Sequence, residues 1–164
     1  MRSEQELRSA IDKYADTVTR ICMLHLHNKS DTEDIFQTVF SKYLHHTKPF
    51  ANDEHEKAWF IRITINACKD LQRSFFRSHT VSLDEISDCI APIREEHREI
   101  LEAVLQLPLK YRTVIYLHYY EDRSVPQIAK MLNKNRNTIY THLNRGKQIL
   151  RKMLGGDAIA TENT

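Results

Sequence analysis

The chain has 164 residues, and its 24 Lys and Arg against 22 Asp and Glu leave a formal net charge of only +2. No apolar run approaches the roughly 20 residues that a membrane-spanning helix needs, so the composition excludes an integral membrane protein. With 41% hydrophobic residues, 28% charged residues, three Gly, four Pro and almost no strand-like alternation, it favours an all-α fold. Its length fits one ordinary domain or two small helical ones.

The three cysteines, Cys22, Cys68 and Cys89, are odd in number and scattered. No basic segment followed by an apolar stretch opens the chain, so neither secretion nor a disulfide framework is indicated, and we expect a cytoplasmic protein. Cys22, His25 and His27 lie close in sequence. A helix would spread Cys22 and His27 over different faces and no fourth ligand is apparent, so we expect no metal site and no cofactor.

Three amphipathic helices are predicted in the first half of the chain. Residues 4–27 carry one apolar stripe at alternating steps of four and three, which is typical of core packing. Residues 31–46 open with acidic residues, which the helix dipole favours, and continue with two adjacent apolar seams, Ile35 with Val39 and Phe36 with Phe40. This stripe is wider than one small core needs. Part of it faces a partner, or the whole helix belongs to the core.

The third predicted helix runs from about 55 to 77 and follows a polar loop, residues 48–56, that holds the aromatic Phe50. Its expected inward residues are Trp59, Phe60, Ile63, Ala67, Leu71 and Phe75. From Trp59 onward the four basic residues exceed the single acid, Asp70, by three. A face that mixes Arg, Asn and aromatic residues favours phosphate contacts and base stacking, with an ordinary solvated face as the alternative.

A change in composition separates this block from a second one. Residues 78–96 are acidic, with Asp84, Glu85, Asp88, Glu95 and Glu96, and are read as a linker. From residue 97 an apolar face precedes Leu107 and Pro108, where the helix should stop, and a further helix is expected over 109–120. The small, polar tail, residues 155–164, is predicted to be disordered.

Residues 124–154 predict two helices joined by a tight turn. Ser124 and Gln127 stand three apart before an apolar run, which is a capping box, and Pro126 falls in the first turn, where its missing N–H costs little. Asn133 can adopt the left-handed geometry of the turn, and Asn135 can cap the second helix. The pattern is that of a helix-turn-helix motif, although an ordinary helical hairpin would also fit it.

The second helix of this pair has an apolar seam and a polar outer face. The seam comprises Ile139, Leu143, Leu150 and Leu154 with either Gly146 or the Lys147 stem, and the outer face comprises Arg136, Asn137, Tyr140, Thr141, Asn144, Arg145 and Gln148. Between Lys110 and Met153, ten Lys and Arg face only two acids, a net charge of +8. This local surplus indicates binding to phosphate groups and favours the helix-turn-helix interpretation.

Several separated motifs, in this order, resemble the extracytoplasmic-function sigma factors of the sigma-70 family, the promoter-specificity subunits of bacterial RNA polymerase. The resemblance covers most of residues 7–154. It rests on Asp31, Asp34, Ile35, Gln37 and Phe40, on Trp59, Ile63, Asn66, Asp70 and Arg73, and on Leu107, Pro108, Arg112, Val114, Tyr119, Tyr120, Ile128, Ala129, Thr138, Ile139, Leu143, Arg145 and Leu150. It implies a first domain over 1–77, a connector over 78–96 and a second domain over 97–154.

The resemblance also implies partners and site residues. Core RNA polymerase, through its β′ clamp helices and β flap, would be one partner, promoter DNA another, and an anti-sigma factor a third. Core-polymerase binding is expected at Asp31, Asp34, Ile35, Gln37 and Phe40. The melted minus-ten element is expected at Lys48, Phe50, Asn52, Trp59, Arg62, Asn66, Lys69, Arg73 and Arg77. The minus-thirty-five element is expected at Arg136, Asn137, Thr138, Tyr140, Thr141, Asn144, Arg145, Lys147, Arg151 and Lys152.

Some residues depart from the family pattern. Asn133 replaces the more usual glycine, and Tyr140 and His142 stand where relatives often have basic residues, so the minus-thirty-five sequence does not follow from theirs. Two other classes of protein fit the sequence less well. A stand-alone helix-turn-helix regulator would bring a dimer interface or sensor domain, which the first 77 residues do not resemble. An enzyme would need a nucleophile with a base, paired carboxylates or a Gly-rich phosphate loop, and none is apparent.

Overall fold

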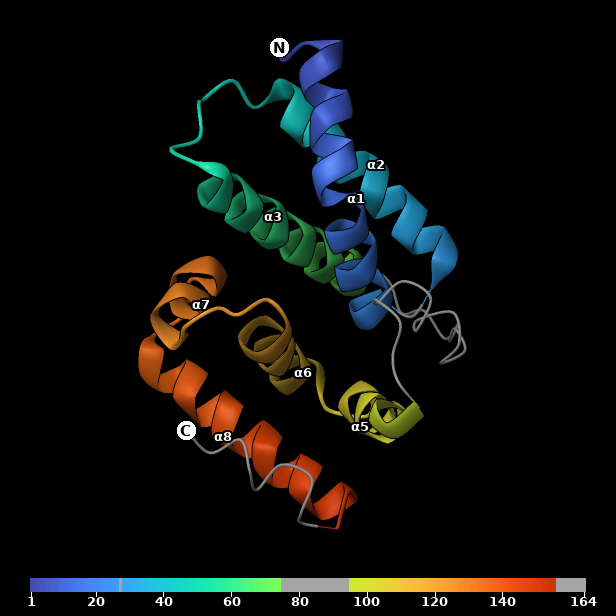
Figure 1. The fold of residues 1–164 in the computed structure, drawn as a ribbon, viewed down its shortest axis with the longest axis vertical. Coiled ribbons are helices and arrows are strands. Elements are labelled where there is room, and N and C mark those ends of the chain that lie inside the picture. The colour runs from blue at the N-terminus through green and yellow to red at the C-terminus, as the bar shows by residue number, and fades with distance from the viewer. Residues whose placement is uncertain (27, 75–94, 156–164) are drawn as a thin grey trace. The chain divides into compact units, whose positions relative to one another are not determined.

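The structure, a computed structural model, describes residues 1–26, 28–74 and 95–155, and every regular element in these ranges is a helix (Figure 1). The all-α prediction is therefore confirmed. The chain divides into two compact units, Met1–Pro92 and Ile93–Thr164. No helix among the described residues is long and apolar enough to cross a membrane.

The first unit is a three-helix bundle in which each helix contacts the other two. It comprises α1 (Glu4–Leu26), α2 (Lys29–His45) and α3 (Asp53–Ser74). Asn28 caps α2 by accepting a hydrogen bond from the Asp31 N–H at 2.9 Å. Phe60 is fully buried at the centre, with its ring 4.6 Å from that of Tyr14 and 5.3 Å from that of Phe40. Stacked and tilted aromatic rings thus hold the three helices together.

The wide apolar stripe of α2 is used within the unit. Ile35, Val39 and Phe40 are at most 6% exposed, and only Phe36 is half-buried. Because α2 packs against both α1 and α3, its two seams each have a neighbour inside the bundle. The all-core alternative therefore describes the packing of Ile35 and Phe40 within this unit, and their expected role in core-polymerase binding stays a prediction.

Helix α3 buries more of its surface than the sequence pattern predicted. Ile61, Ile65 and Cys68 are fully buried although the predicted inward stripe omitted them, whereas Ile63 is half-buried. Contact with two helices widens the buried arc beyond a single stripe. The predicted positions 75–77 lie outside the described residues.

Two of the cysteines meet inside this bundle. Cys22 of α1 and Cys68 of α3 are fully buried, and their Sγ atoms are 3.9 Å apart. The contact with Cys68 and burial raise the pKa of the Cys22 thiol. His25 instead contacts the carbonyl oxygen of Ile21 through Nδ1 at 2.8 Å. His27, the third residue of the rejected metal cluster, lies outside the described residues.

The second unit contains α5 (Glu95–Leu105), α6 (Leu109–Ile115), α7 (Val125–Leu132) and α8 (Arg136–Met153). Helix α6 continues as the π-helical segment η1 (Tyr116–Tyr120), so the predicted helix over 109–120 is present with a widened last turn. Pro108 ends the preceding turn and begins α6, as the sequence predicted. Helix α5 starts within the predicted linker, whose residues 78–94 lie outside the described part of the chain. Of the predicted tail, only Gly155 is described.

A half-buried arginine stabilises the turn between α5 and α6. Nη2 of Arg112 donates to the carbonyl oxygens of Leu105 and Leu107, each at 2.9 Å. These carbonyls lie at and just beyond the last residue of α5, where the helix offers them no N–H partner. Burial lowers the pKa of the Arg112 guanidinium. Arg112, one of the residues that carried the family resemblance, therefore has a structural role in this turn.

Candidate nucleic-acid interface

Helix α7 begins with the predicted capping box. The Gln127 N–H donates to Oγ of Ser124 at 3.3 Å, and the Ser124 N–H donates to Oε1 of Gln127 at 2.8 Å. Pro126 lies in the first turn. Two N–H groups that the helix leaves without partners are thus satisfied, which fixes where α7 starts.

The turn between α7 and α8 has the geometry that the two asparagines predicted. Asn133 adopts the left-handed conformation, with φ 53° and ψ 49°, and the Lys134 N–H donates to the Ala129 carbonyl at 2.9 Å. Oδ1 of Asn135 accepts from the N–H groups of Asn137 at 2.9 Å and Thr138 at 3.3 Å. The beginning of α8 is therefore held by a side-chain cap, and the helix-turn-helix prediction is confirmed.

Helix α8 packs its predicted seam inward and lies very close to α6. Ile139, Leu143 and Leu150 are at most 5% exposed, and Gly146 is buried between them. The sequence left open whether Gly146 or the Lys147 stem completes the seam, and the structure shows that Gly146 is the buried residue. Leu154, at the C-cap, is half-buried.

The opposite face of α8 is polar and open. The residues exposed there are Arg136, Asn137, Tyr140, Thr141, Asn144, Arg145, Gln148 and Lys152. Tyr140 is 51% exposed, which is unusual for a large aromatic side chain on a helix of a small unit. The Thr141 hydroxyl donates to the Asn137 carbonyl at 2.9 Å, and Thr138 is half-buried, so these two predicted site residues offer less to a ligand than their neighbours.

Arg145 lies beside Tyr111 of α6. A hydrogen bond from Arg145 lowers the pKa of Tyr111, and Lys110, whose Nζ is 5.1 Å from the Tyr111 ring centre, lowers it further. The ring of His142 meets the Tyr111 ring edge-on at 5.6 Å. In the same unit, Glu121 is buried and accepts from the Tyr116 hydroxyl at 2.8 Å.

A pocket of about 540 Å³ lies on this side of α8. It is lined by Tyr111, Arg145, Gln148, Ile149, Arg151 and Lys152. Three of the six lining side chains are cationic, and none is acidic. Lys147 lies apart from this group, with Nζ 5.6 Å from the ring centre of Tyr119. The cationic pocket and the exposed polar face of α8 together form a surface that suits a phosphate backbone.

In the first unit, α3 presents a second polar face. Arg62, Asn66 and Arg73 are exposed and Lys69 is half-buried. Arg73 and Asp70 form an exposed ion pair at 3.9 Å, which is weak in water. Arg77 lies outside the described residues. The exposed residues recur at intervals of about one turn, so they share one side of the helix.

The aromatic residues predicted for the minus-ten element, Phe50 and Trp59, pack against each other and against neighbouring rings. Trp59 is 7% exposed, and its ring lies 5.7 Å from Phe50 and 5.0 Å from His46. Phe50 is half-buried and also meets the His55 ring edge-on at 5.4 Å. The fold thus surrounds the Trp59 ring with aromatic neighbours, in agreement with its predicted inward position, and its expected role at the minus-ten element stays a prediction.

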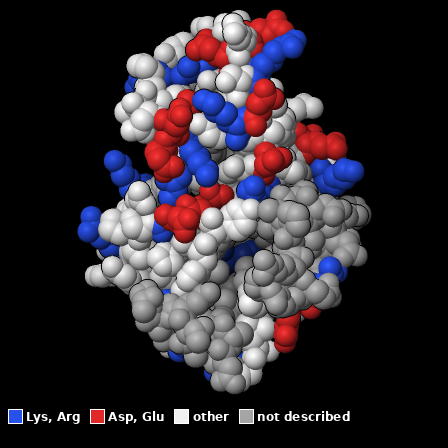
Figure 2. Space-filling view, in the orientation of Figure 1, with Lys and Arg blue, Asp and Glu red and all other residues white. Residues whose placement is uncertain are grey.

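Two further polar residues have partly structural roles. Oδ1 of Asn52 accepts from the His55 N–H at 2.8 Å, so Asn52 caps α3 rather than presenting a free amide oxygen. On α2, Asp31 is 2% exposed and buried beside its cap, whereas Asp34 and Gln37 are exposed. The expected role of Asp31 in core-polymerase binding stays a prediction, and its burial leaves little surface for a direct contact. On the face that Figure 2 shows, acidic and basic side chains are interspersed over the first unit.

Sequence reasoning missed two residues near these surfaces. Tyr111 was not assigned a role, although an aromatic residue next to Lys110 on an amphipathic helix was a visible signal. Arg2 was not considered at all, yet it donates to the carbonyl of Lys48 in the segment that precedes α3. No local pattern points to a contact that spans 46 residues.

Comparison with known protein families identifies both units. The family model described as "Sigma-70 region 2" matches residues 10–78, and the one described as "Sigma-70, region 4" matches residues 97–150. The chain belongs to the sigma-70 family. Its two matched regions contain the polar face of α3 and the helix-turn-helix, respectively.

The curated relatives of this sigma factor are of the same kind. It is 28% identical to RNA polymerase sigma factor SigV of Bacillus subtilis over 90% of each chain. It is 29% identical to the ECF sigma factor SigW of the same organism, over 88% of this chain and 86% of that one. These similarities place the sigma factor in the extracytoplasmic-function type, and its function is promoter-specific transcription initiation.

Two solved structures share the fold. The sigma factor RpoE from Bartonella quintana, solved in complex with the anti-sigma factor NepR, has a TM-score of 0.71 at 15% identity, over 93% of this chain and 99% of that chain. CnrH, solved in complex with the cytosolic domain of CnrY, has a TM-score of 0.68 at 20% identity, over 95% of this chain and 92% of that chain. Similarity at this level of identity establishes the fold.

Proposed function

We propose that the second unit binds the minus-thirty-five element as duplex DNA, with the first turns of α8 in the major groove. The capped turn fixes the direction of α8, and Arg136, Tyr140 and Asn144 are exposed along its outer face. Side chains of these types reach base edges or the thymine methyl group. Two of the three pocket cations, Arg151 and Lys152, lie further along the helix, where they would contact phosphates and add affinity without reading sequence.

In the same proposal, the first unit holds the melted minus-ten element. Arg62, Asn66 and Arg73 share the exposed side of α3, and the exposed Lys48 lies in the segment before it. Cationic and amide groups on one face suit an unpaired strand, whose phosphates and base edges are both accessible. Opening the duplex costs a few kcal/mol per unstacked step, which contacts to the unpaired strand would offset.

The polar residues of α2 would dock on core RNA polymerase. Asp34 and Gln37 are exposed on the outer side of α2, while the apolar side chains of that helix are committed to the bundle. The family resemblance assigns this helix to the β′ clamp helices and the second unit to the β flap. The RpoE similar in fold to this chain was solved with an anti-sigma factor, which supports such a partner for this chain as well.

This mechanism consists of binding and melting without covalent chemistry, so the protein would act as a non-enzymatic subunit. As a subunit of RNA polymerase, it would act in the cytoplasm. Residues 78–96 would connect the two units near the RNA exit channel. The observation that carries the proposal is that a capped helix-turn-helix and a cationic face on α3 occur in one chain, matched by the two sigma-70 regions in order. A stand-alone regulator would need only the first of these features.

The deciding experiment is transcription from genomic DNA by core polymerase with and without the full chain, followed by sequencing of the transcripts. We expect a set of start sites that appear only with the protein and share two upstream elements. Specific promoter binding by the pure chain, with no change in transcription by polymerase, would instead indicate a stand-alone regulator.

Docking is tested by Asp34→Arg, with Glu33→Arg as the matched control. Both acids are exposed on α2, but they point about 100° apart around the helix. We expect only Asp34→Arg to prevent co-elution with core polymerase in size-exclusion chromatography, with both variants equally helical. Co-elution of both variants at the wild-type level would refute the docking assignment. Melting is tested by Asn66→Ala and Arg73→Ala, which should reduce permanganate reactivity of the promoter bubble. Both variants should transcribe a pre-melted template better than the duplex, but bind its unpaired strand more weakly than the wild type does.

A further inference from the structure

The segment between α2 and α3 is held at several points. At its start, the His46 N–H donates to the Tyr43 carbonyl at 3.1 Å, which closes the end of α2. Near its end, the Ala51 N–H donates to Nδ1 of His55 at 3.0 Å, and Asn52 caps α3. Between these points the carbonyl of Lys48 accepts a hydrogen bond from Arg2, a residue that precedes α1.

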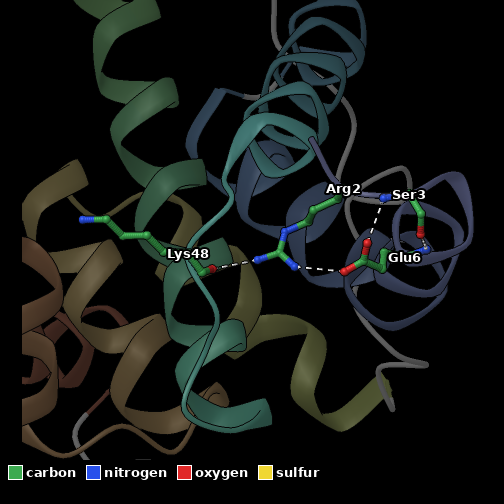
Figure 3. Close-up of polar contacts among 4 residues, drawn as sticks. All are labelled: Arg2, Ser3, Glu6 and Lys48. Carbon is green, nitrogen blue, oxygen red and sulfur yellow. Dashed lines mark hydrogen bonds and ion pairs between the residues drawn. The ribbon is translucent and has the colours of Figure 1, made fainter.

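Arg2 joins this segment to the start of α1, because its guanidinium lies between the Lys48 carbonyl and the Glu6 carboxylate, as Figure 3 shows. Its backbone N–H donates to the Leu44 carbonyl at 2.8 Å, and Nη2 donates to the Lys48 carbonyl at 2.9 Å. The guanidinium carbon lies 4.6 Å from the ring centre of Tyr43 and 5.2 Å from that of Phe50. The Arg2 side chain is only 13% exposed, so these cation–π and hydrogen-bond contacts are largely shielded from water.

The start of α1 holds Arg2 in this position. Nη1 of Arg2 donates to Oε1 of Glu6 at 3.3 Å. Glu6 is itself oriented by a reciprocal pair of hydrogen bonds with Ser3: the Ser3 N–H donates to Oε2 of Glu6 at 2.8 Å, and the Glu6 N–H donates to Oγ of Ser3 at 3.1 Å. Hydrogen bonds from Ser3 lower the pKa of Glu6, and the positive charge of Arg2 contributes a smaller lowering. The carboxylate is therefore ionised at neutral pH. A chain of contacts therefore runs from the cap of α1 through Arg2 to the Lys48 carbonyl.

We propose that Arg2 is a positioning residue for capture of the unpaired minus-ten strand: it fixes the conformation of residues 46–52 so that this segment is pre-organised beside the polar face of α3. The inference rests on the proposed function of the first unit. We call the contacts of Arg2 with this segment the latch. A segment that is ordered before the strand arrives loses less conformational entropy on binding, so the latch raises affinity and base discrimination although Arg2 does not contact the DNA. The reach of Arg2 across Tyr43 to a backbone carbonyl makes the effect independent of the Lys48 side chain.

The test compares Arg2→Ala and Arg2→Lys with Arg8→Ala in holoenzyme assembled on a promoter found by the transcript sequencing. Arg8 is the matched control, because it is an arginine six residues further along the chain, in α1, and forms an exposed ion pair with Glu4 at 2.8 Å. The readout is affinity for a template whose minus-ten strand is already unpaired, measured for the natural base and for each replacement at every position. A second readout is binding of the same holoenzyme to the upstream duplex element alone.

We expect Arg2→Ala to weaken binding of the unpaired strand by about tenfold and to reduce the preference for the natural base. Upstream duplex binding and polymerase association should not change. Arg2→Lys should recover only part of the loss, because an ammonium group lacks the planar fork that spans a carbonyl and a carboxylate. Arg8→Ala should behave as the wild type. Discrimination equal to the wild type in Arg2→Ala would overturn the inference.

Two further variants separate this outcome from a failure of the proposed function. If Asn66→Ala and Arg73→Ala leave binding of the unpaired strand unchanged, the assignment of the minus-ten element to α3 is wrong. If they weaken it and Arg2→Ala does not, only the latch is wrong. Should Arg2→Ala unfold the first unit, the milder Glu6→Gln replaces it, since it keeps a side chain of the same size and removes the charge that orients Arg2. The same loss of discrimination is expected, and its absence in a folded variant would refute the latch.

Discussion

Gly146 of α8 approaches Ile115 of α6 so closely that a Cβ at Gly146 would lie 3.0 Å from Cγ1 of Ile115 and 3.3 Å from its Cδ1. It would also lie 3.4 Å from Cβ of Tyr111. Larger side chains at this point must push the two helices apart. The near absence of a side chain at position 146 is therefore what lets α8 lie against α6.

We expect Gly146→Val to lower the free energy of unfolding of the second unit by about 2 to 3 kcal/mol, because overpacking at a helix crossing forces backbone shifts. Gly146→Ala should stay within about 1 kcal/mol of the wild type, since the gain in helix propensity offsets a small displacement of Ile115. Gln148→Val, an exposed change to the same residue type on the same helix, is the control. Urea unfolding followed by circular dichroism measures the change.

The single tryptophan of the chain, Trp59, is in the first unit, so its fluorescence reports that unit separately. The Gly146→Val effect should appear in the dichroism transition and leave the fluorescence midpoint unchanged. A shift of both transitions by the same amount would contradict a local effect at the α6–α8 crossing.

Arg112→Ala should also destabilise the second unit, by about 2 to 3 kcal/mol. The substitution leaves the carbonyls of Leu105 and Leu107 without their shared donor, and hydrogen bonds to charged groups contribute more than neutral ones. Arg112→Lys should recover part of the loss, because an ammonium group can donate to these carbonyls. The same urea titration measures both variants, and a loss below about 0.5 kcal/mol in Arg112→Ala would show that water replaces the guanidinium.

Substitutions at the two ends of the α8 surface should have different effects on DNA binding. Arg145→Ala should cost about 1 to 3 kcal/mol on the preferred upstream element and little on a scrambled one, because Arg145 is exposed on α8 and an arginine can donate two hydrogen bonds to one guanine. Lys152→Ala should weaken binding to all sequences alike and reduce the salt slope by about one unit. Holoenzyme affinity on both templates at several salt concentrations decides.

A structural role for Arg145 would give a different pattern. If Arg145 only supports the packing of Tyr111, its loss would lower the melting temperature and weaken binding to both templates equally. Tyr111→Phe separates the two roles, because it removes the hydroxyl that accepts from Arg145 and keeps the ring. Equal losses on the two templates would refute base reading by Arg145.

The stability of the first unit should fall at mildly acidic pH through His46. Burial, followed by the charges of Arg2, Lys48, Arg62 and His55, lowers the pKa of His46 below the ordinary histidine value of 6.5. The unfolded chain then binds more protons than the folded chain below pH 6.5, so the free energy of unfolding declines as pH falls through this window and is constant above it.

Tryptophan fluorescence is suited to this measurement, because the His46 ring lies 5.0 Å from that of Trp59. Urea midpoints between pH 5.5 and 7.5 should show a smaller decline in His46→Gln than in the wild type. The control, His45→Gln, changes the adjacent exposed histidine and should retain the wild-type slope. Equal slopes in all three proteins would exclude His46 as a source of the pH dependence.

The sequence predicted well whatever depended on local chemistry. The Ser124 and Gln127 capping box, the left-handed Asn133 and the Asn135 cap are set by residues within one turn of each other, and all three were found as predicted. The periodicity of apolar residues likewise located every described helix. Interactions of this kind depend on sequence separation alone, so a pattern along the chain captures them.

The sequence predicted less where two or more helices share a residue. It left open whether the apolar stripe with Ile35 and Phe40 is all core, because the pattern does not show that α2 has two neighbours. It predicted that Trp59 points inward, but not which aromatic rings surround it. Two contacts join segments that are far apart in the chain, Arg2 with Lys48 and Arg145 with Tyr111, so no local motif predicts them.

The buried pair of thiols, Cys22 and Cys68, can report how often the helical bundle of the first unit opens. A thiol reacts as its thiolate, and these two are fully buried, with the pKa of Cys22 raised by its neighbour and by burial. In a Cys89→Ser background, the rate at which a thiol reagent labels the chain therefore equals the intrinsic rate multiplied by the fraction of time for which the bundle is open. Adding core polymerase or promoter DNA to that reaction would show how much each one lowers the labelling rate, and so how much binding stabilises the packing of α1 against α3.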